Sequence, residues 1–205
     1  MAEEIALTRI EAALRRIQAD LSELGVRWAL IGGFAVSARA APRFTRDLDL
    51  AVTVPDDKAA EALVASLVAR GHKAVAVVEQ TPTSRLATVR LVPPGENEQG
   101  VVVDLLFASS GIEAEIVAAA SAIEVLPSLI VPVARAGHLL AFKVLSRDDE
   151  ERPQDAADIR ALLDSLSTED ARLAAETAAL IQDRGYARSR NIVADVRAAL
   201  ASRSR

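Results

Sequence analysis

The amino-acid sequence predicts an α/β (α+β) fold in which a mixed, twisted sheet is flanked by helices and followed by a helical C-terminal part. Three observations lead to this prediction. Residues 26–54 show the pattern of a strand, a diglycine turn, a short helix and a second strand. Apolar residues in segment 4–24 recur at the spacing of an amphipathic helix. From about Ala134 the pattern is helical, which divides the chain into an α/β domain, residues 1–133, and a helical subdomain, residues 134–205.

The first predicted elements are set by an apolar stripe and by glycine. The stripe in segment 4–24 consists of Ile10, Leu14, Ile17, Leu21 and Leu24. Gly25 ends this helix, because glycine readily takes the left-handed conformation that often follows a helix. A strand at 26–31, a short helix at 33–41 and a strand at 47–54 come next.

The middle of the chain alternates between apolar runs and turn residues, which predicts short strands. The polar segment 93–100 fits a hairpin tip, although a mobile loop near a substrate also fits. Pro127 and Pro132 indicate edge strands, because proline cannot donate to a sheet ladder. The remaining elements are expected as a helix at about 56–70, strands at 72–79, 83–92 and 101–107, a helix at about 111–120, two edge strands within 122–134, and helices around Lys143, from Pro153, at 167–182 and at 188–202.

The composition indicates a soluble protein of the cytoplasm. The 205 residues are 51% hydrophobic and only 3% aromatic, so we expect a core of Ala, Leu, Val and Ile. The absence of cysteine excludes disulfides and thiolate metal sites. No apolar run is long enough to cross a bilayer and the first residues are not a basic signal peptide, so no membrane partner is expected.

The charge is unevenly distributed along the chain. A net charge of −5 argues at first against a nucleic-acid partner. Segment 184–205, however, contains six arginines against the single acid Asp195. A basic C-terminal helix on an acidic body suits an RNA backbone, and a solvated surface helix explains the same pattern equally well.

Two aspartates open the second strand of the 26–54 unit. Asp47 and Asp49 are two residues apart, so their carboxylates project from the same face of a strand. The opposite face carries the apolar row Leu48, Leu50, Val52 and Val54. Two like charges this close repel each other unless a cation lies between them, and Mg²⁺ (or Mn²⁺) is the usual oxygen-bound cation beside phosphates. A single acidic pair is also common on an exposed strand, so the pair alone is weak evidence.

The diglycine Gly32-Gly33 supplies the phosphate side of a possible site. Glycine lets the backbone approach a ligand closely, and a helix that starts there directs free N–H groups toward an anion. Arg43 and Arg46 flank the acidic pair and can neutralise phosphate charge. Diglycine alone usually marks a plain turn, but the combination within one strand–helix–strand unit is more specific.

Asp104 lies within the apolar run VVVDLLF. An ionised carboxylate in such a strand is costly unless it is paired or coordinated. Its neighbours in the sequence offer no partner, which favours a third metal ligand beside Asp47 and Asp49. The alternative is a buried aspartate that is bonded to backbone amides or to an arginine.

A second informative region spans residues 138–163. Lys143 is one of only three lysines against 21 arginines, and its compact ammonium suits a triphosphate. Arg147, four residues later, shares its helical face. In the next helix Asp155 fits a dipole-stabilised first turn, whereas Asp158 has less structural justification. Snorkelling of Lys143 past its apolar neighbours is the structural alternative.

These motifs together resemble a known family. The diglycine followed by R-x-T-x-D-x-D, which is Arg43, Thr45, Asp47 and Asp49 here, is similar to the signature of the nucleotidyltransferase superfamily that includes DNA polymerase beta. More narrowly, the chain resembles the AbiEii-type nucleotidyltransferases, which are toxins of toxin–antitoxin pairs, and their MenT relatives. Many superfamily members have Gly-Ser where this chain has Gly33-Phe34, so backbone amides replace a serine contact. The resemblance covers about residues 28–165.

The resemblance implies a metal-dependent nucleotidyltransferase fold and activity, with a nucleoside triphosphate as substrate and Mg²⁺ (or Mn²⁺) as cofactor. It implies RNA, in particular the 3′ end of tRNA, as acceptor and an antitoxin as partner. The implied catalytic residues are Asp47, Asp49, Asp104, Lys143 and Asp158, of which the first three bind metal. The implied nucleotide-binding residues are Gly32, Gly33, Arg43, Thr45 and Lys143. The sequence does not decide between Asp155 and Asp158 as the functional acid of the last helix pair.

Two other functions remain open at this stage. An enzyme that modifies a small alcohol such as an aminoglycoside would have the same motifs, and an acidic pocket would favour that cationic substrate. A nucleotide-binding module without turnover, which acts through a partner protein, is the third possibility. The presence of Asp47, Asp49, Asp104 and Lys143 together argues against it.

Overall fold

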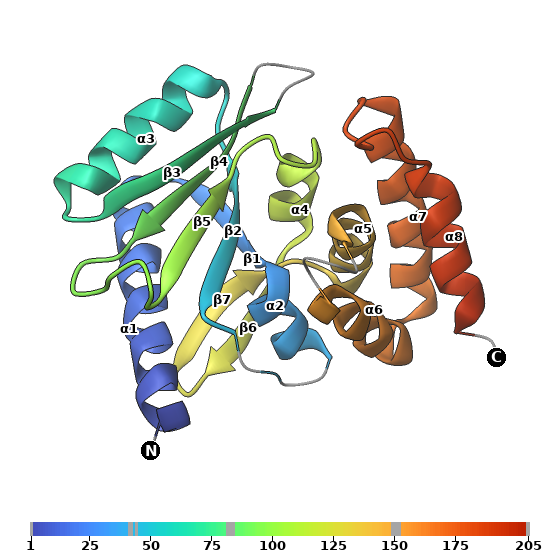
Figure 1. Ribbon diagram of the computed structural model, residues 1–205, viewed down its shortest axis with the longest axis horizontal. Coiled ribbons are helices and arrows are strands. Elements are labelled where there is room, and N and C mark those ends of the chain that lie inside the picture. The colour runs from blue at the N-terminus through green and yellow to red at the C-terminus, as the bar shows by residue number, and fades with distance from the viewer. Residues whose placement is uncertain (1, 41–42, 44, 81–84, 149–152, 204–205) are drawn as a thin grey trace.

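The computed structural model describes residues 2–40, 43, 45–80, 85–148 and 153–203 (Figure 1). The elements in chain order are α1 (Ala2–Glu23), β1 (Arg27–Ile31), α2 (Gly32–Arg39), β2 (Asp47–Thr53), α3 (Asp57–Ala69), β3 (Lys73–Gln80), β4 (Arg85–Val92), β5 (Val102–Leu106), α4 (Glu113–Ala119), β6 (Ser121–Leu126), β7 (Leu129–Val133), α5 (Ala136–Ser146), α6 (Pro153–Ser165), α7 (Thr168–Asp183) and α8 (Ile192–Ser202). The predicted α/β fold with a helical C-terminal part is thereby confirmed.

The seven strands form one mixed sheet in the order β3-β4-β5-β2-β1-β7-β6. β2 lies at its centre, antiparallel to β1 and parallel to β5. The register places Asp49 directly beside Asp104. Because paired residues on neighbouring strands share a face, the two carboxylates project from the same side of the sheet.

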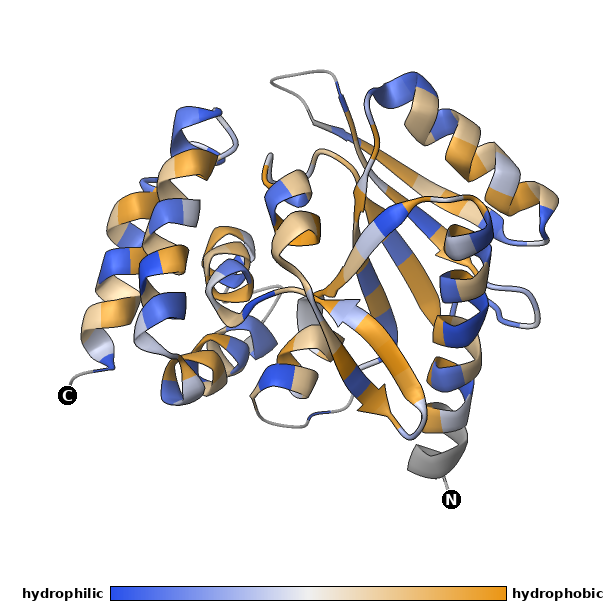
Figure 2. Cartoon of the chain, turned by 180° about the vertical axis from the view of Figure 1, so that it is seen from behind, coloured by the Kyte–Doolittle hydropathy of each residue, from blue (hydrophilic) through white to orange (hydrophobic). Residues whose placement is uncertain are grey.

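The two faces of the sheet are covered by different helices (Figure 1). α1 and α3 lie on one side, and α2, α4 and the C-terminal helices lie on the other. The apolar row of β2 confirms the expected alternation, since Leu48 and Leu50 are fully buried and Val52 is 1% exposed. In Figure 2 the outward side of α1 is largely hydrophilic, whereas the predicted stripe residues Ile10, Leu14, Ile17 and Leu21 are buried against the sheet.

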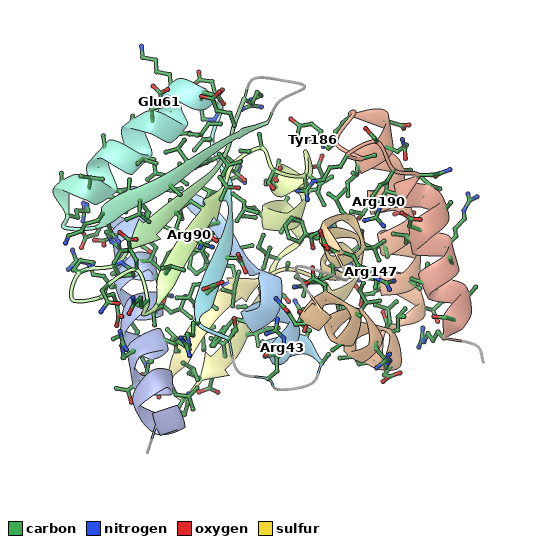
Figure 3. All side chains as sticks on the ribbon, in the orientation of Figure 1. Arg43, Glu61, Arg90, Arg147, Tyr186 and Arg190 are labelled. Atoms are coloured by element: carbon green, nitrogen blue, oxygen red, sulfur yellow. The ribbon has the colours of Figure 1, made fainter. Side chains whose placement is uncertain are left out.

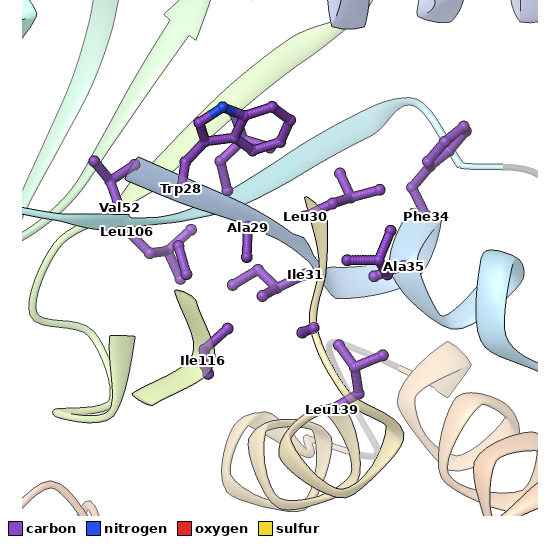
Figure 4. Close-up of a cluster of buried hydrophobic side chains, with 14 of the residues drawn as sticks. Trp28, Ala29, Leu30, Ile31, Phe34, Ala35, Val52, Leu106, Ile116 and Leu139 are labelled. Carbon is purple, nitrogen blue, oxygen red and sulfur yellow. The ribbon is translucent and has the colours of Figure 1, made fainter. Parts of the chain in front are cut away.

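The core continues from the sheet into the helical part. Figure 4 shows Ile31 and Ile116 on the same side of β1 as Leu139 from α5, while Trp28 points to the opposite side. Buried apolar residues from α1, the sheet, α5, α7 and α8 belong to one cluster. The helical part therefore packs directly on the sheet face that carries the aspartates.

Two predicted elements differ from the structure. β7 is not an edge strand, because it lies between β1 and β6 and pairs in parallel with β1 at Leu30 and Val133. The last helix begins at Ile192 rather than at residue 188, because Arg188 and Ser189 have positive φ angles of 53° and 61°. The side chain of Asn191 instead accepts a hydrogen bond from the Ala194 amide and caps α8.

In the part of the chain that the structure describes, no helix combines the length and the apolar character that a membrane span requires.

Candidate active site

The acidic face of the sheet is the first part of the site. Asp47 is exposed, Asp49 is half-buried and Asp104 is only 8% exposed. Asp49 and Asp104 are register partners, and Asp47 lies two residues earlier on the same face of β2. The structure thus brings the three predicted metal ligands to one face of two neighbouring strands.

The diglycine turn lies against this acidic face. Gly32 follows the last residue of β1 and has a φ of +67°, a conformation that favours glycine. A Cβ atom on Gly32 would overlap Oδ2 of Asp49. The backbone at the start of α2 therefore directly contacts the carboxylate of β2, and only glycine permits this contact.

Arg43 lies against the second glycine of the turn. A Cβ atom on Gly33 would overlap the guanidinium of Arg43. The hydroxyl of Ser37 accepts a hydrogen bond from the backbone amide of Arg43 at 3.2 Å. It donates to the carbonyl oxygen of either Gly33 or Arg43, each of which lies 3.1 Å away. Ser37 thus holds Arg43 over the N-terminal end of α2.

Arg43 connects the diglycine turn to the C-terminal helices. Its Nε and Nη2 donate to the two carboxylate oxygens of Asp158 on α6, at 2.6 and 2.8 Å. Lys143 on α5 lies beyond, with Nζ at 2.9 Å from Asp158 Oδ2 and 2.7 Å from Asp155 Oδ1. Figure 3 shows Arg43 between α2 and α6, where it links the sheet side to this buried network.

The network is buried and charged. Lys143 is 7% exposed, and Asp155 and Asp158 are each 1% exposed. Burial opposes ionisation of Asp158, but hydrogen bonds from Arg43 and Lys143 outweigh it and lower the pKa of that carboxyl. The hydrogen bond to Asp158 raises the pKa of Arg43, and Asp155 and Asp49 contribute to this increase. The guanidinium of Arg43 is therefore held charged beside the glycine turn.

The side chain of Asp104 has a partner that its neighbours in the sequence did not indicate. Arg90 on β4 is its register partner and donates to both carboxylate oxygens, from Nε at 2.8 Å and from Nη2 at 2.7 Å. This bond to Asp104 raises the pKa of Arg90, and Asp47 and Asp49 raise it further. Asp104 is thus bonded to an arginine, which is the alternative left open by the sequence, and local sequence did not reveal this partner because it lies across the β4–β5 hairpin.

The donor set fits a hard divalent cation. Asp47 and Asp49 offer carboxylate oxygens on one face beside backbone that only glycine can form, which is the ligand chemistry that Mg²⁺ and Mn²⁺ prefer. Among the described residues, however, no group of three His, Cys, Asp or Glu side chains is close enough to hold a metal ion. Asp104 is engaged by Arg90, so a three-carboxylate site requires Arg90 to move.

Thr45, Arg46 and Arg147 were also named from the sequence. The hydroxyl of Thr45 donates a long, 3.5 Å hydrogen bond to the Asp47 carbonyl oxygen, and Arg46 is exposed. Arg147 does not share the helical environment of Lys143, because α5 ends at Ser146 and Arg147 is exposed.

Two arginines of the basic C-terminal segment have structural roles. Arg184 pairs with Glu115 on α4 at 2.6 Å. Arg190 pairs with Asp195 at 2.9 Å and donates to the Val144 carbonyl oxygen near the end of α5. These contacts show that at least two of the arginines in this segment bind other parts of the protein. For these two, a structural role is favoured over binding of an RNA backbone.

Two residues of the site, Arg90 and Ser37, were not singled out from the sequence, and Asp155 was singled out only as an alternative to Asp158. Arg90 could have been found as a charged residue in an apolar strand that forms a hairpin with the strand of Asp104. Asp155 was attributed to helix-dipole stabilisation, but it is buried and bonds both Lys143 and Ser146. No sequence signal identifies Ser37, because its role depends on the path of the loop that carries Arg43.

The chain is a nucleotidyltransferase, as its family membership shows. The chain belongs to the AbiEii family, because the family model described as nucleotidyl transferase AbiEii toxin, Type IV TA system, matches residues 12–204. No curated protein is similar enough in sequence to count as a match.

Two solved structures of ANT(2'')-Ia show the same fold. The solution structure of the antibiotic-resistance factor ANT(2'')-Ia is 21% identical with a TM-score of 0.54, covering 88% of this chain and 99% of that chain. The crystal structure of ANT(2'')-Ia with adenylyl-2''-tobramycin is 17% identical with a TM-score of 0.53, covering 83% and 96%. The lincomycin-bound lincosamide antibiotic adenylyltransferase LnuA has 15% identity, a TM-score of 0.46, and coverage of 74% and 95%.

Proposed function

We propose that this nucleotidyltransferase moves a nucleoside monophosphate from a nucleoside triphosphate to an acceptor hydroxyl at the site described above. The observation that supports this most directly is the pairing of Asp49 with Asp104 beside the Gly32-Gly33 turn. Carboxylates and a phosphate-binding turn from separate segments converge there. The acceptor oxygen bonds the α-phosphorus, the bond to the β-phosphate oxygen breaks and pyrophosphate leaves.

The cationic and glycine residues hold the triphosphate in this proposal. The amides of Gly32 and Gly33 at the start of α2 donate to phosphate oxygens, and the hydroxyl of Thr45 adds a further contact. Arg43 and Lys143 neutralise phosphate charge. Asp155 and Asp158 hold Lys143 in place, which lowers the entropic cost of binding an ordered triphosphate.

The carboxylates have two roles. Asp47 and Asp49, joined by Asp104 once Arg90 releases it, would hold a divalent metal ion. The metal ion, when bound, would neutralise charge that develops on the phosphate oxygens. Asp104 lies beside Asp49, where it can also take the proton of the acceptor hydroxyl.

RNA is the acceptor that the family membership favours, with the 3′ end of tRNA as the expected site. The AbiEii family is described as a toxin of a Type IV toxin–antitoxin system, which supports a toxin role and a cognate antitoxin. A small hydroxylated cation such as an aminoglycoside is the second candidate acceptor. The structural likeness to ANT(2'')-Ia and the acidic face of β2 and β5 favour it.

The experiment that separates the two acceptors uses labelled nucleoside triphosphates and Mg²⁺ with either total RNA or tobramycin. We expect label in RNA for the wild type and none for Asp49→Asn. Asp164→Asn, a change at an exposed carboxylate on α6, serves as the matched control and should retain activity. Label in tobramycin alone would establish the second acceptor, and no label in either would contradict the proposed transfer.

A growth experiment tests the toxin role separately. Induced expression of the wild type in bacteria should slow growth, whereas Asp49→Ala should not. Equal growth of the two strains would contradict the toxin role and leave the chemistry to the labelling experiment.

A further inference from the structure

β3 is the outermost strand of the sheet and is apolar on its exposed surface (Figure 1). Every residue from Lys73 to Glu79 is exposed. Val77 is 61% exposed, Val78 is 56% exposed and Val75 is 38% exposed. Three of the seven exposed large hydrophobic residues among those described therefore lie on this single strand.

This edge lacks most of the features by which sheet edges avoid pairing. Natural edge strands are usually short, interrupted by proline or charge, or covered by another element. β3 has eight residues and reads KAVAVVEQ, with neither proline nor an internal charge between Lys73 and Glu79. Register shifts between Ala74 and Ala76 and between Val78 and Glu79 disturb both ends of the strand, but pairing with β4 is regular between them, from Ala76 to Val78.

We propose that β3 is a dimerisation edge, on which the β3 strand of a second copy of this chain pairs in antiparallel orientation. The strand offers unpaired backbone N–H and C=O groups that continue the hydrogen bonding of the sheet. A two-fold axis near the middle of β3 would join the two sheets into one continuous sheet. A register that pairs Lys73 with Glu79 places Val75 of one copy opposite Val77 of the other and Val78 opposite Ala74.

The charges at the ends of β3 are complementary to a second copy of the same strand. Lys73 begins the strand and Glu79 lies near its end, and neither has an ion-pair partner among the described residues. Antiparallel pairing brings the Lys73 end of one copy to the Glu79 end of the other. The two-fold axis repeats this contact, so each dimer gains two opposite-charge contacts and no like-charge contact between these ends.

The adjoining helix adds apolar surface on one side of this edge. An open groove of about 380 Å³ lies between α3 and the β3–β4 hairpin; its lining is apolar at Val64, Ala65, Val77, Leu86 and Val89 and acidic at Asp57, Glu61 and Glu79. Val68 on α3 is 44% exposed. In the proposed pair the two α3 helices lie on the same side of the joined sheet, next to the shared edge, where the apolar side chains are covered.

The proposed dimer leaves the catalytic face open. β3 is separated from β2 by β4 and β5, so the shared edge does not include Asp47, Asp49 or the diglycine turn. The dimer can therefore be tested independently of the proposed function.

The test measures the dimer dissociation constant by sedimentation equilibrium. The wild type should dimerise at micromolar concentrations. Lys73→Glu and Glu79→Lys should each weaken the dimer about tenfold, because each creates two like-charge contacts. The double variant Lys73→Glu/Glu79→Lys should restore wild-type affinity. An equimolar mixture of the two single variants should form a heterodimer, since both ends then pair opposite charges.

Two further variants separate the edge from general hydrophobic association. Val78→Asp should abolish the dimer, whereas Ile130→Asp should not, although Ile130 on β7 is similarly exposed at 58%. Thermal unfolding establishes that each variant is folded. A monomeric wild type, equal effects of Val78→Asp and Ile130→Asp, or a mixture of the charge variants that fails to associate would each overturn the proposal.

Discussion

The carboxylate of Asp49 lies directly on the backbone of Gly32, so closely that any side chain at residue 32 would overlap Asp49 Oδ2. This contact joins the acidic strand to the diglycine turn. Gly32 also has a φ of +67°, a conformation that residues with a side chain rarely adopt. Both parts of the proposed site therefore depend on the absence of one Cβ atom.

Gly32→Ala tests this contact, with Gly25→Ala as the matched control. Gly25 has nearly the same φ, +66°, but no atom lies within 4 Å of the position that a Cβ atom would take there, so it reports backbone strain alone. We expect Gly25→Ala to cost about 1 kcal/mol of unfolding free energy and to retain activity. Gly32→Ala should cost at least about 1 kcal/mol more and abolish transfer, as measured by urea unfolding and product formation. Equal losses in the two variants would contradict a specific contact.

Lys143→Met tests the buried charge network. Its removal leaves Asp155 facing Asp158 with only Arg43 as a cation, so we expect a loss of about 3 kcal/mol or more in unfolding free energy. Asp155→Asn in the same chain should recover part of this loss, because one uncompensated charge is removed. A double-mutant cycle by urea unfolding measures the coupling, and additive effects would show that the two residues act independently.

Arg90→Gln tests whether this arginine competes with a metal ion for Asp104. The change removes a cation that is bonded to Asp104 and close to Asp47 and Asp49, so the affinity for Mn²⁺ should rise about tenfold. Arg85→Gln on the same strand is the control, since Arg85 pairs instead with Asp57. Isothermal titration calorimetry measures both affinities. Unchanged or weaker binding by Arg90→Gln would contradict competition.

His138 should make the protein less stable in acid. Burial, assisted by the charge of Arg135, lowers the pKa of this imidazole to about 4, against the partly opposing effect of Glu115 and Asp170. As the pH falls, His138 is protonated in the unfolded chain before it is protonated in the folded protein. The contribution of the neutral imidazole to the unfolding free energy is therefore fully present above about pH 6.5 and is lost as the pH falls toward 4. Between neutral pH and about pH 4.5, the unfolding free energy of His138→Gln should fall by about 2 kcal/mol less than that of the wild type. Parallel losses in urea unfolding at both pH values would contradict this assignment.

Local sequence patterns predicted most of the elements and the acidic strand. The alternation of Asp47 and Asp49 with Leu48 and Leu50 fixes the two faces of β2 without information from the rest of the chain. The stripe in α1 is similarly local. These predictions were confirmed because each depends on spacing within a single element.

Relations between distant strands were not accessible in this way. Arg90 and Asp104 meet only because the β4–β5 hairpin has one particular register. β7 lies inside the sheet because it pairs with β1, about a hundred residues earlier in the chain. The burial of Asp155 likewise depends on how α6 packs on α5, which the first-turn position of this aspartate does not reveal.

The route by which the chain assembles the site has a consequence during translation. The glycine turn, the β2 acids, Asp104, Lys143 and Asp158 come from five segments of the chain, and the last of these is α6. A nascent polypeptide whose α6 is still inside the ribosome tunnel lacks the group that anchors Arg43 and Lys143. The site is therefore incomplete until α6 has been synthesised and has left the tunnel.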